Sequence, residues 1–189
     1  AARRALQRLA DDEDLRVDHP GEKWSVMEEV KTPMGIQTRV VVSDESRYFD
    51  LNALALQTRP GARPASDILM DIMIQCGEFA PSSFIAALTD WVDADEEGFK
   101  ESSFYAKRDA PYSSMNRRLY AWDELRWVDG YKADWFIPSD RVSDRESPRS
   151  SLKTCVTMLP APSQQIVPIN MNTAGIGVLS AVLNAVAPG

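Results

Sequence analysis

The spacing of apolar residues changes along the chain, and this change limits the possible folds more than any single motif does. After Gly35, one set of residues alternates with another. The first set is Ile36, Thr38, Val40 and Val42, and the second is Gln37, Arg39, Val41 and Ser43. A period of two is typical of a β-strand or an arm of a hairpin. After a Pro- and Gly-containing linker at 58–64, apolar residues recur every three or four positions, as they do in amphipathic helices. Strands followed by helices predict an α+β fold.

Several segments have the apolar spacing of helices. Ser66 can cap one of them, Pro81 suits the first turn of the next, and Asn172 or Thr173 can cap the last. The uncharged run at its end is about 14 residues long and is too short to span a bilayer, so we expect a core helix there. The charged, Ser-rich residues 138–151 predict a surface loop. The helical segments are residues 2–10, 66–77, 81–92, 121–128 and 174–187.

The chain is acidic. Its 189 residues include 28 Asp and Glu against 21 Lys and Arg, which gives a formal net charge of −7. This balance argues against nucleic acid and anionic membrane surfaces as main ligands. Apolar residues make up 44% of the chain and charged residues 26%. These are globular values, and they exclude a disordered or fibrous protein.

One histidine and two cysteines limit the available chemistry. Cys76 and Cys155 fit no zinc or copper spacing, and His19 lies in a loop beside Pro20 and Gly21. A soft-ligand metal site and a Cys-His nucleophile pair are therefore disfavoured. The sequence leaves two alternatives for the cysteines, which are two buried thiols or, in an oxidising compartment, a disulfide.

The segment from Asp90 to Glu101 concentrates hard oxygen ligands. Asp93, Asp95 and Glu97 alternate and are followed by Gly98, as in the first half of an EF-hand calcium loop. The second half of that motif fails, because Phe104 stands where a bidentate Glu is required. Glu101 could contribute from the ninth position. The segment therefore predicts a calcium site that is not an EF-hand, and the alternative is a solvated acidic connector.

Other functional motifs are weaker. Gly175-Ile176-Gly177 lacks the third glycine and the strand context of a dinucleotide-binding loop. The same segment is similar to a helix-hairpin-helix module, but it has no neighbouring Lys or Arg for phosphates. A hydrolase with paired carboxylates could be built on Asp90, Asp93 or Asp95. So many carboxylates in one loop are better explained by solvation or a bound metal.

Several motifs occur in order over nearly the whole chain. They are Val-Asp-His-Pro-Gly-Glu-Lys-Trp at 17–24, Asp-Leu-Asn-Ala-Leu at 50–54, Leu-Thr-Asp-Trp-Val-Asp-Ala-Asp at 88–95, Ala-Pro-Tyr at 110–112, Glu-Leu-Arg at 124–126 and Ile-Asn-Met-Asn-Thr-Ala at 169–174. Glu101, Tyr105 and Asn116 complete the central group. Taken together, these motifs resemble the type II secretion system minor pseudopilin K family.

The resemblance implies a specific architecture. It is an α+β fold with a pilin-like N-terminal helix and an antiparallel sheet, into which a large all-α domain is inserted. In this sequence, residues 1–57 would hold the remainder of the N-terminal helix and the first strands. Residues 58–168 would form the inserted helical domain with the acidic loop. Residues 169–189 would hold the Asn-Thr-Ala segment and the start of a further helical part that is incomplete here.

The resemblance also implies a function without catalysis. Family members assemble with minor pseudopilins I and J at the tip of the periplasmic pseudopilus, and they initiate or cap it for protein export. An N-terminal helix, absent from this sequence, anchors the full-length protein in the inner membrane. The expected location is the periplasmic side of that membrane. The alternative is a calcium-stabilised extracytoplasmic binding or adhesin-like domain.

Calcium binding in the family strengthens the expectation for the acidic loop. Asp93, Asp95 and Glu101 match acidic positions of the family motif, whereas Glu97 is a candidate ligand through its spacing only. A periplasmic location would also permit a Cys76–Cys155 disulfide.

Overall fold

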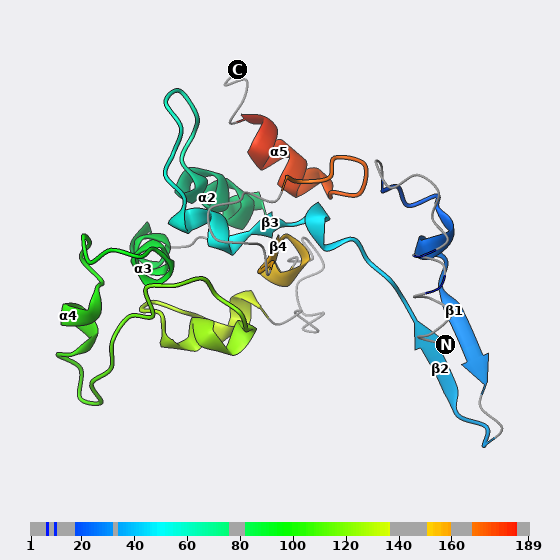
Figure 1. Ribbon diagram of the computed structural model, residues 1–189, viewed down its shortest axis with the longest axis horizontal. Coiled ribbons are helices and arrows are strands. Elements are labelled where there is room, and N and C mark those ends of the chain that lie inside the picture. The colour runs from blue at the N-terminus through cyan, green and yellow to red at the C-terminus, as the bar shows by residue number, and fades with distance from the viewer. Residues whose placement is uncertain are drawn as a thin grey trace, which may run out of the picture.

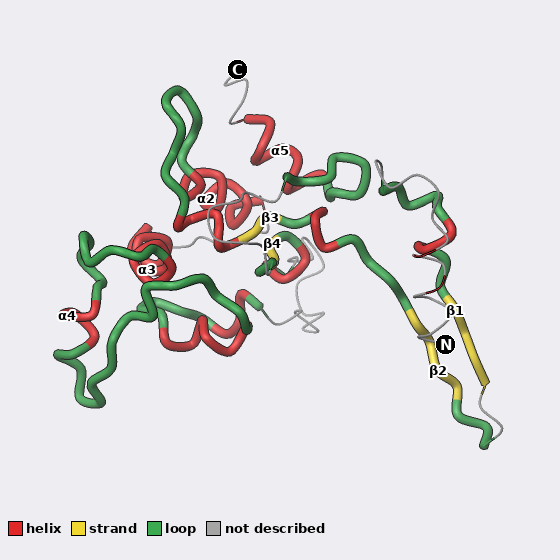
Figure 2. The backbone as a smooth tube through the Cα atoms, viewed as in Figure 1, coloured by secondary structure: helices red, strands yellow, loops and turns green. Residues whose placement is uncertain are grey.

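The computed structural model describes Gln7, Ala10 and residues 18–31, 34–75, 82–136, 151–159 and 168–184. A helical body and a β-hairpin stand apart and are joined by an extended segment (Figure 1). Irregular loops make up much of the body between its helices (Figure 2). Within the described ranges, no helix is long and apolar enough to cross a membrane.

The hairpin consists of β1 (Glu28–Lys31) and β2 (Gln37–Val40), which pair antiparallel. Arg39 Nη2 lies 3.0 Å from Glu29 Oε1 across the two strands. The strand predicted from residue 36 is therefore confirmed. It lies largely in solvent, since Gln37 to Arg39 are exposed and Val40 is half-buried. Among the described residues, no third strand pairs with the hairpin.

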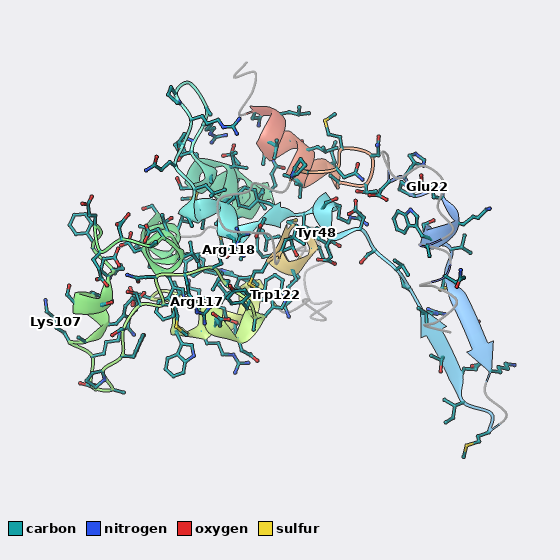
Figure 3. The ribbon with its side chains drawn as sticks, viewed as in Figure 1. Glu22, Tyr48, Lys107, Arg117, Arg118 and Trp122 are labelled. Carbon is teal, nitrogen blue, oxygen red and sulfur yellow. The ribbon has the colours of Figure 1, made fainter. Side chains whose placement is uncertain are left out.

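The second sheet links distant parts of the chain. β3 (Phe49–Asp50) pairs in parallel with β4 (Val156–Thr157). Arg118 Nη2 lies 3.2 Å from Asp50 Oδ2 and 3.3 Å from the Leu159 carbonyl oxygen, so it links its own loop to β3 and to the residues just after β4 (Figure 3). Burial raises the pKa of Asp50, while hydrogen bonds from the backbone and the charge of Arg118 oppose that rise.

Asn52 provides a second link from the same region. It belongs to the 3₁₀ helix η3 (Leu51–Ala55) and is 1% exposed. Its Nδ2 donates to the Leu119 carbonyl at 3.2 Å, and its Oδ1 accepts from the Leu119 N–H at 2.7 Å. The side chain thus pairs with a peptide as a neighbouring strand would, and it satisfies two buried backbone groups.

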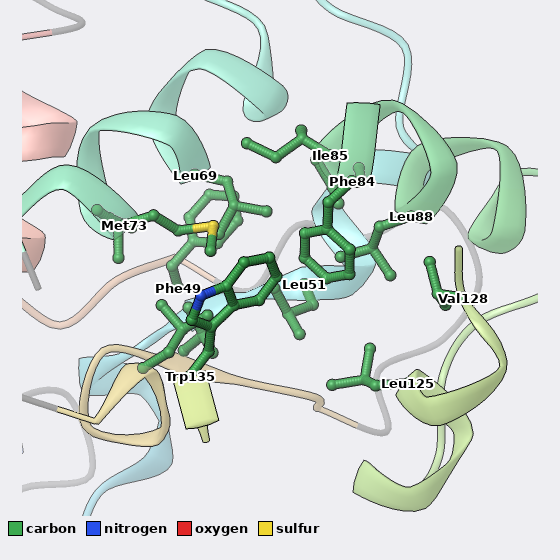
Figure 4. Close-up of a cluster of buried hydrophobic side chains, with 14 of the residues drawn as sticks. Phe49, Leu51, Leu69, Met73, Phe84, Ile85, Leu88, Leu125, Val128 and Trp135 are labelled. Carbon is green, nitrogen blue, oxygen red and sulfur yellow. The ribbon is translucent and has the colours of Figure 1, made fainter. Parts of the chain in front are cut away.

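The core of the body lies between α2 (Ala65–Gln75) and α3 (Ser82–Val92). Leu69 and Met73 of α2 and Phe84 and Leu88 of α3 are buried (Figure 4). The ring centroid of Trp135 lies 4.8 Å from that of Phe84. These two helices confirm the helical spacing at 66–77 and 81–92 within the described residues.

α5 (Ile176–Asn184) packs against α2 with Val178 and Ala181 buried. It begins later than the sequence predicts, because Thr173 is not its cap. The Thr173 hydroxyl donates to Asp44 Oδ2 at 2.6 Å, and Asn170 Nδ2 donates to the same oxygen at 2.9 Å. These hydrogen bonds fix the segment that leads into α5 on the turn before η2 (Glu45–Arg47).

The helix expected at 121–128 is a 3₁₀ helix, η4 (Trp122–Trp127). Glu124 Oε1 accepts the N–H groups of Tyr120 and Ala121 at its start, and Gly130 with φ of +80° turns the chain away after its end. An isolated turn of six residues gains few α-helical hydrogen bonds. The other short helices are η1 (Lys23–Ser25), α4 (Ser102–Tyr105), η5 (Ala133–Trp135) and η6 (Leu152–Thr154).

The mixture of helices and small sheets confirms the α+β class. Several expectations lie outside the described residues. They concern Cys76, the loop at 138–150 and the helix at 2–10, of which only Gln7 and Ala10 are described, both helical. Cys155 is buried, with its Sγ 3.8 Å from Thr154 Oγ1. Its pairing with Cys76 stays a prediction.

Candidate metal centre

Two carboxylates lie at the C-terminal end of α3. Asp90 is in the last turn of the helix, and the Asp93 N–H continues the helical pattern by donating to the Thr89 carbonyl at 3.0 Å. Residues three apart on a helix share a face. The last turn of α3 contains no basic residue, so two negative side chains meet the negative end of the helix dipole. A positive charge at this end of the helix would therefore be stabilising.

The loop after α3 turns back toward Asp90. Asp95 Oδ1 accepts the Glu97 N–H at 2.8 Å, and this short-range bond bends the chain. The Lys100 N–H then donates to Asp90 Oδ2 at 2.8 Å. Glu101 follows at once and precedes α4, so the return of the loop places a third carboxylate beside the end of α3.

Glu96 connects the loop after α3 to Ser102 and Asn116. Its carboxylate accepts the Ser102 hydroxyl at 2.8 Å and Asn116 Nδ2 at 2.9 Å. Asn116 Nδ2 also donates to the Asp95 carbonyl at 2.8 Å. The Asn116 residue has a φ of 45°, in the left-handed region that Asn tolerates better than most residues. These bonds hold the loop on the 114–118 segment.

Asp90, Asp93 and Glu101 come together in one acidic pocket, each offering a carboxylate oxygen within 4.8 Å of the others. Glu101 is 2% exposed, and neither of its carboxylate oxygens has a hydrogen-bond donor. Asp93 Oδ1 is also buried without a donor. Buried carboxylate oxygens normally have partners, because desolvating them is costly. The three carboxylates of the acidic pocket therefore lack the positive charge that would offset their burial.

The pKa values of Glu101 and Asp93 are raised, because no positive charge offsets the burial and mutual repulsion of these carboxylates. Burial, followed by repulsion from Asp90 and Asp93, raises the pKa of Glu101 to about 7. Burial, followed by repulsion from Asp95 and Asp90, raises the pKa of Asp93 to about 6. In the protein without a cation, protons relieve part of the repulsion. A divalent cation would relieve it at neutral pH.

Two basic side chains close in sequence to the acidic loop, Lys100 and Arg108, form ion pairs with another residue. Lys100 Nζ lies 3.0 Å from Asp129 Oδ2 and 3.7 Å from the centroid of the Phe104 ring. Arg108 also pairs with Asp129. These contacts hold the loop against the segment after η4. They direct both positive charges to Asp129 and not to the carboxylates of the acidic pocket.

The candidate ligands predicted from the sequence thus fall into two groups. Asp93 and Glu101 lie in the acidic pocket, whereas Asp95 and Glu97 are exposed and lie outside the group of three. Asp90 is the member that the calcium hypothesis missed, because counting an EF-hand loop from Asp93 leaves it out. The spacing of Asp90 and Asp93 across one helical turn was the available signal. A ligand role for Asp95 and Glu97 stays a prediction.

Two comparisons with known proteins point to the type II secretion system. Residues 47–137 match the family model described as "Type II secretion system (T2SS), protein K". This match contains α2, α3, the acidic pocket and η4. No curated protein sequence matches the chain.

The chain is also similar to a chain in the crystal structure of the GspK-GspI-GspJ complex from the enterotoxigenic Escherichia coli type 2 secretion system. The TM-score is 0.72 with 26% sequence identity, and the similarity covers 98% of this chain. It covers 64% of the chain in that complex, so the present sequence spans about two thirds of its relative's length.

Proposed function

We propose that this chain acts as a non-catalytic minor pseudopilin at the tip of the pseudopilus, because residues 47–137 match the family model of the type II secretion system protein K. In this role it assembles with minor pseudopilins I and J and initiates or caps the pseudopilus for protein export. The observation that carries the proposal is the similarity over 98% of the chain to a chain of the GspK-GspI-GspJ complex. The proposed location is the periplasmic side of the inner membrane.

In this proposal the chain works through shape and contact. Residues 1–57 form the pilin-like part, residues 58–168 form an inserted domain, and residues 169–189 begin the part that follows. The inserted domain is mainly helical and not all-α as expected, because its residues Val156–Thr157 form β4 beside β3. The helical body is bulky beside the slender hairpin (Figure 1). A bulky body at the tip would prevent a further subunit from adding above it. The proposed antiparallel sheet would extend the hairpin of β1 and β2, since a ribbon of two strands is marginal by itself.

A calcium ion at the acidic pocket is the second part of the proposal. The donor set fits, because Asp90, Asp93 and Glu101 supply only hard carboxylate oxygens and both Glu101 oxygens lack donors. The ion would supply structural charge compensation and no redox or acid-base chemistry. Asp95 and Glu97 are further candidates, directly or through water. A cation held by α3 and by the residue before α4 would pin the loop-rich segment that follows.

The test of the main proposal is reconstitution. The chain is mixed with the purified periplasmic parts of pseudopilins I and J from the same organism, and the mixture is separated by size exclusion. A ternary complex supports the proposal. Folded components that elute separately contradict it, and calcium-dependent stability in that case would favour the extracytoplasmic binding or adhesin-like domain.

The calcium proposal has its own test, which is thermal melting with calcium or with a chelator. Free calcium at 100 times the dissociation constant should stabilise the protein by about 2.7 kcal/mol. Asp93→Ala should remove this stabilisation, whereas Asp67→Ala, on the exposed part of α2, should keep it. A midpoint that calcium leaves unchanged in the unmutated protein refutes the cation site.

A further inference from the structure

Gly98 lies against the carboxylate of Asp90. A Cβ atom on Gly98 would lie 2.6 Å from Asp90 Oδ1 and closer still to Cγ and Oδ2. Carbon and oxygen atoms without a bond between them do not approach so closely, so a side chain at this position would force something to move. The glycine therefore permits a close approach between the loop and the end of α3.

Neither side of this contact can move away easily. Asp90 has a short side chain on a helix, and its Oδ2 accepts the Lys100 N–H at 2.8 Å. Lys100 is in turn held by Asp129 and the Phe104 ring. Glu101, the next residue, starts α4 through its carbonyl, which accepts the N–H groups of Phe104 and Tyr105. A displacement at residue 98 would therefore reach two carboxylates of the acidic pocket.

We propose that Gly98 is a positioning residue of the acidic pocket. Because it has no side chain, the turn 98–100 can lie on Asp90 and hold the Asp90 carboxylate in register with those of Asp93 and Glu101. This inference rests on the proposed cation site, and it assigns a role to a residue that contributes no ligand atom. The φ of Gly98 is outside the left-handed region, so the steric contact alone makes glycine necessary.

The test compares Gly98→Ala with Gly177→Ala. A Cβ on Gly177 would meet only Gln75 Cβ at an ordinary 3.7 Å. Binding is measured by calcium titration calorimetry and by Tb³⁺ luminescence sensitised by Trp91, which adjoins Asp90 in sequence. By analogy with the loss of other groups that orient metal ligands, Gly98→Ala should weaken binding by about 10- to 100-fold. Gly177→Ala should bind as the unmutated protein does. Equal affinity in Gly98→Ala refutes the inference.

A second measurement separates this inference from the cation proposal. In chelator, the Lys100 amide resonance should shift in Gly98→Ala and stay in place in Gly177→Ala, whether or not the unmutated protein binds calcium. If calcium does not bind but the resonance shifts, the cation site is wrong and the positioning contact stands. An unchanged resonance rules out the contact.

A double substitution covers the case in which Gly98→Ala does not fold. Asp90→Ala removes the carboxylate that a Cβ at residue 98 would meet. The variant Asp90→Ala/Gly98→Ala should then fold with the same melting midpoint as Asp90→Ala alone. A further loss of stability in the double variant would contradict the proposed contact.

Discussion

Replacing Glu101 by Gln should change how stability depends on pH, and the size of the effect follows from the acidic pocket. The pKa of Glu101 rises from its ordinary value of 4.5 to about 7 in the folded protein, chiefly because the side chain is buried. This rise corresponds to about 3 kcal/mol at pH values where the group is ionised. At 2% exposure, little solvent remains to screen that cost.

The sign follows from proton linkage. The folded protein holds the Glu101 proton more tightly than the unfolded chain, so the contribution is fully present below pH 4.5 and is lost as the pH rises through about 7. Asp93, whose pKa is raised to about 6, acts in the same direction. Without calcium, the unmutated protein should therefore lose free energy of unfolding between pH 4.5 and pH 8. Glu101→Gln should lose about 3 kcal/mol less over that range.

The assay is urea denaturation in chelator, followed by tryptophan fluorescence at several pH values. The buried Trp91 and Trp135 report on the core. Glu97→Gln is the matched control, because it removes an exposed carboxylate from the same loop and should follow the unmutated protein. With saturating calcium, the carboxylates of the acidic pocket stay ionised in the folded protein as they do in the unfolded chain, so the stability of the unmutated protein should depend little on pH between about 5 and 8. Calcium should stabilise Glu101→Gln far less at every pH in that range. Parallel pH curves for Glu101→Gln and the unmutated protein in chelator would refute the reasoning.

Three further predictions concern the body, and each is measured by urea denaturation. Asn52→Ala leaves the buried peptide groups of Leu119 without partners and should cost about 2 to 3 kcal/mol, whereas unchanged stability would mean that water replaces the amide. Arg118→Met leaves Asp50 buried without its ion pair and should cost about 3 kcal/mol, part of which Asp50→Asn in the same chain should restore. Leu88→Ala should cost about 2 to 5 kcal/mol through the cavity it creates. The control Ile176→Ala, at an 81% exposed position, should stay within about 0.5 kcal/mol.

The sequence predicts those elements whose stability is local. The apolar spacing of α2, α3 and α5 is visible because each buries one face against a neighbour. The 3₁₀ form of η4 is harder to foresee, since its apolar spacing also suits an α-helix. The alternation at β2 predicts the strand correctly, but it does not reveal whether anything covers that strand.

The acidic pocket was predictable only as far as its residues lie close together in the sequence. Asp93 and Glu101 stand in one run of acidic residues, and their chemistry is evident from the sequence. The inclusion of Asp90 depends on where α3 ends and on a loop that returns over Gly98. The hydrogen bonds of Asn52 with Leu119 join residues 67 positions apart, and no local sequence pattern predicts them.

The parallel pair of β3 and β4 has a consequence for the order of folding. Leu159 N–H reaches Asp50 Oδ1 across 109 residues, while the acidic pocket is assembled within a single stretch of the chain. Closing a long loop is slow compared with forming a helix and its adjoining turn. During synthesis, α3 and its acidic loop can therefore form before Val156 is available to cover Phe49. Pulse-labelled hydrogen exchange should find the amides of α3 protected before the Phe49 N–H, which bonds to the Cys155 carbonyl.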